Sequence, residues 1–421
     1  MCDTVRYGPL RYALAGRFEL PRPVPESVDL GESSGQICPQ LPGRLSSVMG
    51  VQKDRLVQGE DCLNLSVTSP SREGRRPVMV FLHGGAFLSG AGLLDWYDGS
   101  ALSGESDVVV VSINYRLGVL GYLCLDGVSR GNLGLYDQLE ALRWVQANIA
   151  GYGGDPTNVT VFGQSAGAVS IRLLMEMPQA RGLFTRAILQ SGPGSYLARP
   201  LEVAEDVGRL FASKLGQDPR KATVTALLGA QEQTTAAWAQ GGADRGAAAA
   251  PPFYPVSGTD PLLAPGETFS ENVQGLDVIC GWNADDVSAF GAAQSDVAAH
   301  TQRMLAEPIC ALAEELNAAD AQVHTYRLDW RPTGSALGAT HCVELPLLLG
   351  TQRSWDPSPM LGSAPWDQVD TLGRKLRHVW GHFARTGQVR PEALAEIPLV
   401  WNPHPSAGCP NTLQINASDG L

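Results

Sequence analysis

The sequence predicts an α/β fold with a central, mostly parallel β-sheet flanked by helices. Continuous apolar runs, which are typical of strands covered on both faces, alternate along the chain with segments of helical period. This alternation requires crossover connections, and such connections favour parallel strands. Neither an internal repeat nor a clean linker interrupts the 421 residues, so we expect residues 1–421 to form one domain.

The expected elements follow one another in order. Strands are predicted at residues 77–82, 107–114, 158–162, 186–190, 276–280, 323–328 and 412–415. Helices, with apolar residues three or four positions apart, are predicted at residues 135–149, 168–175, 201–228 and 366–385. Residues 1–60 are Pro-rich and are expected to be irregular. The stretch around 230–252 is rich in Ala and Gly, and a mobile surface loop, a poor helix and a linker remain open for it.

Residues 163–167 form a G-x-S-x-G pattern between a predicted strand and a predicted helix. Strand, tight turn and helix are the context of a nucleophile elbow. Such a turn should hold Ser165 in a strained backbone conformation, with its hydroxyl clear of the sheet. Gly163 and Gly167 lack side chains, so the strand and the helix can pass close to each other. We therefore predict that Ser165 is a nucleophile.

The segment 83–87, His-Gly-Gly-Ala-Phe, directly follows the strand predicted to end at residue 82. It matches the HGGG-type loop whose backbone N–H groups stabilise an oxyanion. Ala86 replaces the third glycine but keeps its N–H. We expect an oxyanion hole built from the N–H groups of Gly85, Ala86 and Ala166; a glycine-rich turn without such a role is the alternative.

A serine hydroxyl also needs a general base and an orienting carboxylate. In folds that use this kind of elbow, the acid and then the histidine follow the serine along the chain. This order leaves six histidines open as the base: His300, His324, His341, His378, His382 and His404.

Further motifs surround the elbow. They are EDCLNLSV at 60–67, NYRLG at 114–118, GNLGLYDQ at 131–138 and GGDPTNVT at 153–160. With these motifs the chain resembles the type-B carboxylesterase/cholinesterase family of α/β-hydrolases, as a compact, bacterial-type member. The match is dense from about residue 36 to residue 192 and patchier beyond. The resemblance implies the α/β-hydrolase fold and a serine carboxylesterase that acts on small to medium carboxylic esters through an acyl-enzyme, without a metal or an organic cofactor.

The resemblance also selects the rest of the catalytic triad. The base of the family lies in an H-x-x-E-L-P segment, which falls at 341–346 and makes His341 the base. The acid lies in a G-x-x-x-D-E segment, which falls at 281–286. Asp286 there takes the place of the catalytic glutamate and keeps the carboxylate on an arm one methylene shorter. Asp285 is the competing candidate.

Two departures from the family pattern bear on the site. Gln164 stands where the family usually has Glu before the nucleophile, so the imidazolium of His341 should be less stabilised. The interval from Asp286 to His341 is shorter than in the larger relatives, which implies a more open site.

Pocket and disulfide positions follow from the resemblance as well. Phe87, Leu88 and Phe290 match substrate-binding positions, with packing in the core as the alternative. Cys38 and Cys62 match the first disulfide pair of the family, and their oxidation would depend on the compartment.

Composition argues against several classes of partner. The net charge of −12 disfavours nucleic acid and anionic membranes. No stretch approaches the ~18 consecutive apolar residues of a membrane span, and the first twenty or so residues lack the pattern of a signal peptide. None of the eight cysteines forms a C-x-x-C motif, which disfavours zinc-ribbon and thioredoxin-type sites. We therefore expect a cytoplasmic enzyme with a small-molecule ester substrate.

Two other functions remain open at this point. The same triad could cleave amides, carbamates or thioesters instead of esters. The fold could also serve as a non-catalytic binding module. The oligomeric state does not follow from the sequence.

Overall fold

A ten-stranded sheet forms the centre of the molecule, which a computed structural model describes for residues 3–31, 35–52, 56–192, 197–240, 250–262, 269–389 and 412–415. Its strands are β1 Val5–Leu14, β2 Arg22–Asp29, β5 Asn64–Ser69, β6 Arg76–Leu82, β7 Val109–Ile113, β10 Gly154–Gln164, β11 Arg186–Gln190, β14 Asp277–Asn283, β15 Gln322–Leu328 and β16 Thr412–Ile415. Their order across the sheet is β16-β15-β14-β11-β10-β6-β7-β5-β1-β2.

The strands from β7 across to β16 are all parallel, which confirms the predicted mostly parallel sheet. Each of the seven predicted strands is present, and most of the observed strands begin or end within a few residues of the predicted bounds. The apolar runs of β6 and β7 are buried almost throughout, as expected for strands covered on both faces.

The antiparallel edge of the sheet was not predicted. β1 pairs with β2 and with β5 in antiparallel register, so the expectation that residues 1–60 are irregular is wrong for these two strands. Gly8 and Pro9 interrupt the strand pattern, and the β1–β5 register shifts between Tyr7 and Leu10. Strands near a sheet edge tolerate such interruptions, which hide them from pattern recognition.

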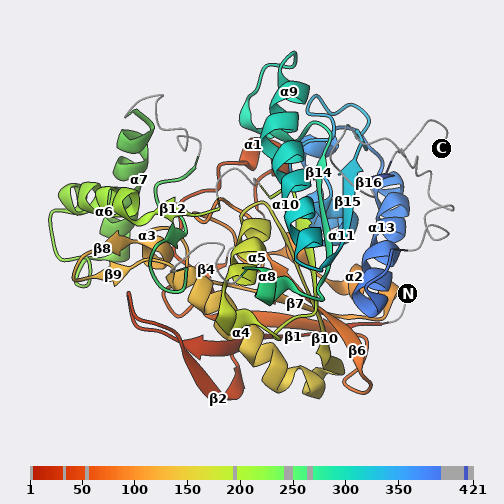
Figure 1. Ribbon diagram of the computed structural model, residues 1–421, viewed down its shortest axis with the longest axis horizontal. Helices are drawn as coiled ribbons and strands as arrows, with labels where there is room; N and C mark the ends of the chain where they lie inside the picture. The colour runs from red at the N-terminus through yellow and green to blue at the C-terminus, as the bar shows by residue number, and fades with distance from the viewer. Residues whose placement is uncertain are drawn as a thin grey trace.

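Helices cover both faces of the sheet (Figure 1). The longer ones are α2 Ser100–Ser106, α4 Leu133–Asn148, α5 Ala166–Glu176, α6 Leu201–Leu215, α7 Val224–Gln240, α10 Glu307–Ala318 and α13 Trp366–Thr386. Short helices are α1 Ser46–Met49, α3 Gly118–Tyr122, α8 Phe269–Val273, α9 Val297–Thr301, α11 Leu345–Leu348 and α12 Gln352–Trp355. No helix in the described ranges is long and apolar enough to cross a membrane.

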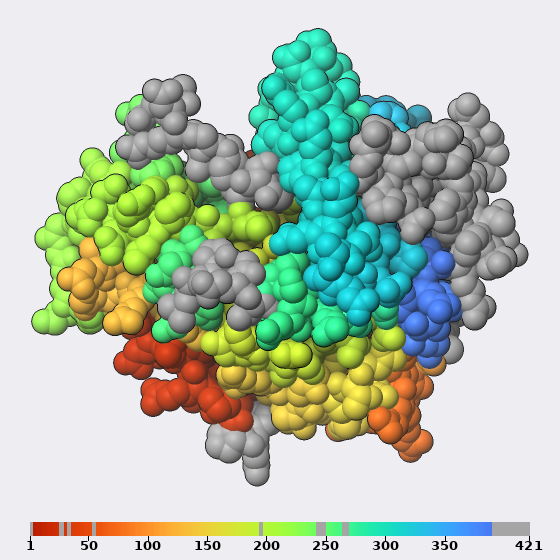
Figure 2. Space-filling view, in the orientation of Figure 1, coloured from red at the N-terminus to blue at the C-terminus, as the bar shows by residue number. Residues whose placement is uncertain are grey.

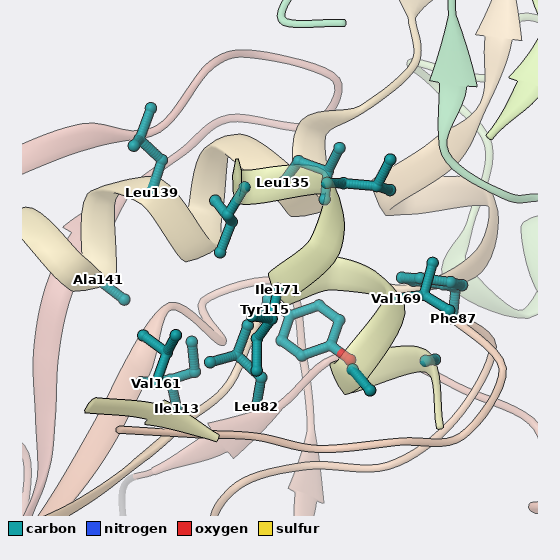
Figure 3. Close-up of a cluster of buried hydrophobic side chains, with 14 of the residues drawn as sticks. Leu82, Phe87, Ile113, Tyr115, Leu135, Leu139, Ala141, Val161, Val169 and Ile171 are labelled. Atoms are coloured by element: carbon teal, nitrogen blue, oxygen red, sulfur yellow. The ribbon is translucent and has the colours of Figure 1, made fainter. Parts of the chain in front are cut away.

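Alternate residues of β6 show how the two faces are packed. Val78, Val80 and Leu82 lie in the larger apolar cluster, together with side chains of α4, α5 and α10. Met79 and Phe81 lie in the second cluster, together with side chains of α2, α11 and α13. Figure 3 shows part of the larger cluster, where α4 and α5 approach the central strands. Burial on both faces therefore places the carboxyl ends of β6 and β10 deep inside the molecule.

The predicted helix at 201–228 is two helices, α6 and α7, which pack against each other at one end of the molecule (Figure 1). Gly216 ends α6 in the left-handed region with φ 67°, and Pro219 follows in the connection. Residues 230–240 belong to α7, so the helical alternative holds there and the mobile loop is wrong. Residues 241–249 lie outside the described residues. Figure 2 shows this helical pair and the α9–α10 ridge as separate protrusions.

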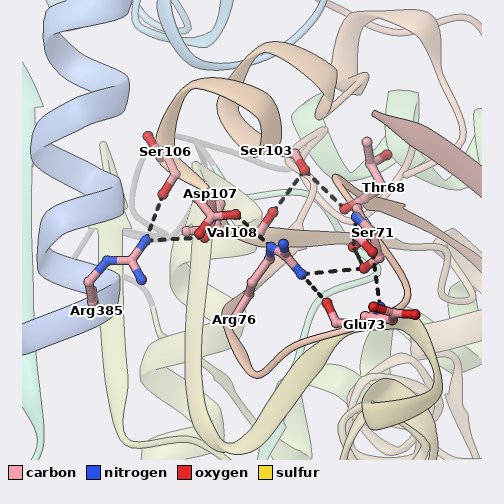
Figure 4. Close-up of polar contacts among 10 residues, drawn as sticks. Thr68, Ser71, Glu73, Arg76, Ser103, Ser106, Asp107, Val108 and Arg385 are labelled. Atoms are coloured by element: carbon pink, nitrogen blue, oxygen red, sulfur yellow. Dashed lines mark hydrogen bonds and ion pairs between the residues drawn. The ribbon is translucent and has the colours of Figure 1, made fainter. Parts of the chain in front are cut away.

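Polar contacts fix the amino ends of β6 and β7 (Figure 4). Arg76 Nε donates to Asp107 Oδ1 at 2.6 Å, and Arg385 of α13 donates to the carbonyl oxygens of Ser106 and Asp107 at 2.9 and 3.1 Å. Asp107 lies in the left-handed region with φ 49° and ends α2, so β7 begins two residues later than the predicted strand. These contacts tie α2 and α13 to the sheet on the same face.

A buried ion pair holds the NYRLG motif against α4. Arg116 donates from Nε to Asp137 Oδ2 at 2.8 Å and from Nη2 to Oδ1 at 2.7 Å. The carboxylate is fully buried, and the backbone N–H of Arg116 donates to it as well. Removing only the cation would leave this charge buried and uncompensated.

Arg116→Met should therefore lower the free energy of unfolding by about 3–5 kcal/mol, measured by urea denaturation. The matched control is Arg75→Met, because Arg75 is largely exposed and forms an ion pair with Asp155 at the surface. That change should cost less than about 1 kcal/mol. Equal losses in the two variants would contradict a special role for the buried pair.

Candidate active site

The predicted elbow is present between β10 and α5. Ser165 lies between them with φ 56° and ψ −120°, a conformation that is strained for a residue with a side chain. Its N–H donates to the carbonyl oxygen of Gln190 on β11 at 2.9 Å, and its own carbonyl accepts from Val169 at 3.0 Å. Backbone hydrogen bonds on both sides therefore hold the serine at the carboxyl edge of the sheet.

Two glycines let this turn fit against the neighbouring strand. A Cβ atom on Gly167 would lie 1.9 Å from the carbonyl oxygen of Leu82, and one on Gly163 would lie 2.8 Å from the carbonyl carbon of Gly167. Backbone contacts of this kind leave no room for a side chain. The predicted close passage of strand and helix is confirmed.

The loop after β6 is strained over consecutive residues. Gly85, Ala86 and Phe87 have φ values of 116°, 57° and 61°, and the last two lack glycine's freedom to adopt them. The hydroxyl of Tyr115 donates to the carbonyl of His83 at 2.7 Å, and the N–H of Gly118 donates to the carbonyl of Phe87 at 2.6 Å. Tertiary contacts therefore maintain a backbone conformation that the loop would not keep alone.

The far end of this loop is held by Gln40, which sequence reasoning did not single out. Its Oε1 accepts from the N–H of Gly90 at 2.7 Å, and its Nε2 donates to the carbonyl of Gly90 at 3.0 Å. Gly90 has a φ of 104°, and a Cβ there would lie 2.5 Å from His83 Nδ1. The glutamine thus closes the loop onto the histidine that begins it.

His83 is a structural part of this loop. Its ring is buried and stacks on Tyr115, with ring centroids 4.3 Å apart. Burial lowers the pKa of His83 to about 4, against a smaller opposing effect of the Gly84 carbonyl. The ring is therefore neutral at physiological pH.

His341 and Asp286 form a buried pair behind the elbow. His341 Nδ1 is hydrogen-bonded to Asp286 Oδ1, and the two side chains are 3% and 0% exposed. Asp286 Oδ2 accepts from the hydroxyl of Ser191 at 2.7 Å and from the N–H of Asn283 at 3.0 Å. Both oxygens of the carboxylate are thus satisfied, which fixes its orientation.

Asp285 lies apart from the histidine. Its carboxylate forms a two-point contact with Arg331, at 2.7 and 3.0 Å, and accepts from the N–H of Ala339 at 2.9 Å. The structure therefore brings Asp286 and not its neighbour to His341. Of the other candidate histidines, His404 lies outside the described residues.

The Nε2 atom of His341 faces Gln164 in this structure. The two atoms His341 Nε2 and Gln164 Nε2 are 3.0 Å apart, and the Phe290 ring centroid lies 5.1 Å from that of the imidazole. No hydrogen bond joins the hydroxyl of Ser165 to His341 among the described residues. Such contacts commonly form only once a substrate is bound.

The net effect of the surroundings is to raise the pKa of His341. Burial lowers it, but the charge and hydrogen bond of Asp286 and the charge of Glu344 act in the opposite direction and outweigh burial. Asp286, which is hydrogen-bonded to Nδ1, and Glu344 therefore stabilise the imidazolium.

The predicted pocket residues differ in their surroundings. Phe87 is fully buried and packs edge-on against Tyr122 and Tyr254, with ring centroids 5.0 and 4.9 Å apart. Leu88 is partly buried. Phe290 is 56% exposed beside the imidazole, as a substrate contact would need to be. The packing alternative thus describes Phe87 better than Phe290.

Cys38 and Cys62 are both buried and are free thiols in this structure. A contact with Cys38 and burial raise the pKa of Cys62, so the two side chains are neighbours. Within the described ranges, no group of three or more His, Cys, Asp or Glu residues could hold a metal ion.

Sequence reasoning missed the residues that support the acid and the loop, namely Gln40, Tyr115, Ser191 and Asn283. Asn283 lies within the 281–286 motif and Tyr115 within the NYRLG motif, and these positions were the signals available for them. Ser191 contacts Asp286 across 95 residues of chain, a separation over which pattern alone carries no information.

A parallel sheet with a serine at the elbow between strand and helix defines an α/β-hydrolase. The family model described as "Carboxylesterase family" matches residues 7–302. The chain therefore belongs to the carboxylesterase family, and it is a carboxylic ester hydrolase of that family. Small-molecule esters are the substrates that this membership implies.

Relatives of similar length agree with this assignment. A probable N-octanoylanthranilate hydrolase of Rhodococcus erythropolis is 40% identical over 416 residues, covering 93% of this chain and 90% of that protein. The para-nitrobenzyl esterase of Bacillus subtilis is 33% identical over 424 residues, covering 90% and 84%. The solved structure of a thermophylic PNB esterase superposes with a TM-score of 0.77 at 30% identity, covering 92% of this chain and 88% of that one.

Gly167→Ala should lower the free energy of unfolding by more than about 1 kcal/mol and slow ester cleavage, because the added methyl overlaps the Leu82 carbonyl and pushes α5 from β6. Thermal denaturation and initial rates with p-nitrophenyl acetate measure both effects. Gly229→Ala is the control, since this glycine of α7 has open space around it and alanine favours helices. Indistinguishable variants would refute the close-contact argument.

Proposed function

We propose that the chain hydrolyses carboxylic esters through an acyl-enzyme, with Ser165 as nucleophile, His341 as general base and Asp286 as the orienting acid. The observation that supports this most strongly is the buried hydrogen bond between His341 Nδ1 and Asp286 beside a strained elbow serine. That arrangement leaves Nε2 of the imidazole as the atom able to take a proton.

In the acylation step, Ser165 Oγ attacks the ester carbonyl carbon and its proton passes to His341 Nε2. The amide of Gln164 must release this nitrogen for the transfer. The tetrahedral intermediate then collapses, the bond to the leaving oxygen breaks, and the imidazolium protonates the departing alcohol. Water repeats the sequence on the acyl-enzyme and releases the carboxylic acid.

The negative charge on the tetrahedral oxygen would be met by the N–H groups of Gly85, Ala86 and Ala166. The strained conformation of residues 85–87 is held by Tyr115, Gly118 and the Gln40 contact before any substrate binds. Donors fixed in advance stabilise developing charge without a cost of reorganisation in the reaction. The elbow helix also begins at Ala166, so its N-terminus favours the same charge.

Amide hydrolysis by the same triad is the second candidate. The relative from Rhodococcus erythropolis is named for an N-octanoyl compound, in which the acyl group is attached to nitrogen, and it matches nearly the whole chain. The imidazolium of His341 would protonate the departing amine in place of an alcohol. Matched substrates that differ only in this leaving atom separate the two candidates.

Ser165→Ala should lower turnover of p-nitrophenyl esters by about 10⁴–10⁶-fold, because only the loop and binding contributions would remain. The panel is acetate, butyrate, octanoate and palmitate, with octanoyl p-nitroanilide as the matched amide. Wild-type cleavage of the octanoate but not the anilide favours the esterase, and the reverse favours the amidase. A wild type no faster than the variant on every substrate would overturn the proposal.

Asp286→Asn should lower kcat by about 10⁴-fold, because an amide cannot stabilise the imidazolium and favours the wrong tautomer. Asp285→Asn should change kcat far less, since Asp285 contacts Arg331 and not the histidine. Steady-state kinetics on p-nitrophenyl butyrate compare the two variants. A larger loss from the Asp285 change would exchange their roles.

A further inference from the structure

A second carboxyl group is buried close behind the His341–Asp286 pair. Glu344 is 1% exposed and lies just before α11, three residues after His341. Its Oε2 accepts from the side-chain amide of Asn283 at 2.6 Å, while the backbone N–H of Asn283 donates to Asp286 Oδ2 at 3.0 Å. One residue at the end of β14 therefore holds both carboxyl groups in place.

No cation compensates Glu344 in the part of the chain that the structure describes. The titratable groups that interact with it electrostatically are Asp286 of the turn after β14, His341 and Cys342 of its own turn, and Tyr326 of β15. The pKa values of Cys342 and Tyr326 are raised, chiefly by burial, so both stay neutral. The imidazole is thus the group that becomes positively charged next to this carboxyl.

Burial and the charge of Asp286 raise the pKa of Glu344 to about 7, against the hydrogen bond from Asn283 and the effect of His341. The Oε1 atom is buried without a hydrogen-bond partner among the described residues. A carboxyl group in this position exchanges its proton in the range in which a histidine works.

On the other side of the imidazole the structure places a neutral group. The side chain of Gln164 is 3.0 Å from His341 Nε2 and, unlike a carboxylate, adds no negative charge there. The negative charges that raise the pKa of His341 are those of Asp286, which is hydrogen-bonded to Nδ1, and of Glu344, which Asn283 links to Asp286. The two sides of the base are therefore electrostatically unequal.

We propose that Glu344 is a positioning residue for the base: its ionised carboxylate, held by Asn283, supplies the second negative charge that stabilises the imidazolium of His341 in the reaction. This inference rests on the proposed function, in which His341 takes the proton of Ser165. Gln164 cannot stabilise the imidazolium by charge, because its side-chain amide is neutral, so this negative charge comes from Glu344.

The sign of the effect on activity follows from the two protonation states. His341 must be neutral in the free enzyme, so kcat/KM rises with pH along an acid limb set by the pKa of the imidazole. An ionised Glu344 raises that pKa. Glu344→Gln should therefore move the acid limb to lower pH and lower the plateau of kcat, because the transition state loses a favourable charge while the neutral ground state does not.

The test compares pH profiles of kcat and KM on p-nitrophenyl butyrate for the wild type, Glu344→Gln, Gln164→Glu and the double variant. Glu344→Gln should lower kcat on the plateau by about 10- to 100-fold, the effect expected of one partly screened charge, with KM little changed. Gln164→Glu should move the acid limb to higher pH. In the double variant the charge is on the other side of the ring, and the limb should return toward its wild-type position.

Glu140→Gln is the matched control, because Glu140 is also buried but lies on α4 beside Arg143, with no contact to the imidazole. Its profile should follow the wild type. A loss in Glu344→Gln that is equal at every pH and is not relieved by Gln164→Glu would mean that Glu344 only packs, and would overturn the inference. A wild type that cleaves neither esters nor amides would instead remove the proposed function, so the two failures are distinguishable.

Stability gives a readout that does not depend on turnover. The folded-state pKa of Glu344 lies above its unfolded value, so the stability that this group contributes is present at low pH and is lost as pH rises through about 7. Glutamine does not titrate. The unfolding temperature of Glu344→Gln relative to wild type should therefore rise between pH 5 and pH 8, and a constant difference would contradict a titrating carboxyl.

Discussion

The contact on which the site depends is the crossing of three backbone segments without side chains between them. At the start of α5, Gly167 lies against the carbonyl of Leu82, and Gly163 lies against both the Leu82 carbonyl and the backbone of Gly167. Because the strained loop begins one residue after Leu82, this crossing sets the distance between Ser165 and the N–H groups proposed as the oxyanion hole. The central sheet supplies the rigidity, since β6 and β10 pair over their length and are covered on both faces.

Strain in the loop is maintained by groups far away in the chain. Residues in the left-handed region at Ala86 and Phe87 each cost on the order of 1–3 kcal/mol, and they persist only if their surroundings determine them. Tyr115, Gly118 and Gln40 supply those contacts from separate segments. The N–H groups proposed as oxyanion donors are therefore fixed without a substrate, which is the condition under which fixed dipoles are most effective.

Local pattern was enough to predict the elements that carry the site, and it failed where the outcome depends on distant partners. The elbow is a short motif between a predicted strand and a predicted helix, and the loop directly follows a predicted strand, so the sequence alone indicated both. β1 and β2 lie at an edge where Gly8 and Pro9 are tolerated, and their pairing with β5 is invisible in their own pattern. Asp285 and Asp286 are adjacent and chemically identical, and only the resemblance to a family favoured Asp286 as the acid. In the structure Asp285 is paired with Arg331 instead of His341, a contact that its own sequence context does not reveal.

The site combines groups that do not titrate with groups that do. The elbow and the strained loop at residues 85–87 are held by packing and backbone hydrogen bonds, so they do not respond to pH. The imidazole side contains two buried carboxyl groups held by Asn283: both oxygens of Asp286 accept hydrogen bonds, whereas Oε1 of Glu344 has no partner among the described residues. A buried negative charge without a cation beside it is costly. Burial and the charge of Asp286 accordingly raise the pKa of Glu344 to about 7, so both protonation states are populated near neutral pH. Substitutions at 164 and 344 should consequently change the pH range of the enzyme more than the bond it cleaves, because neither residue touches the carbonyl group in the proposed mechanism.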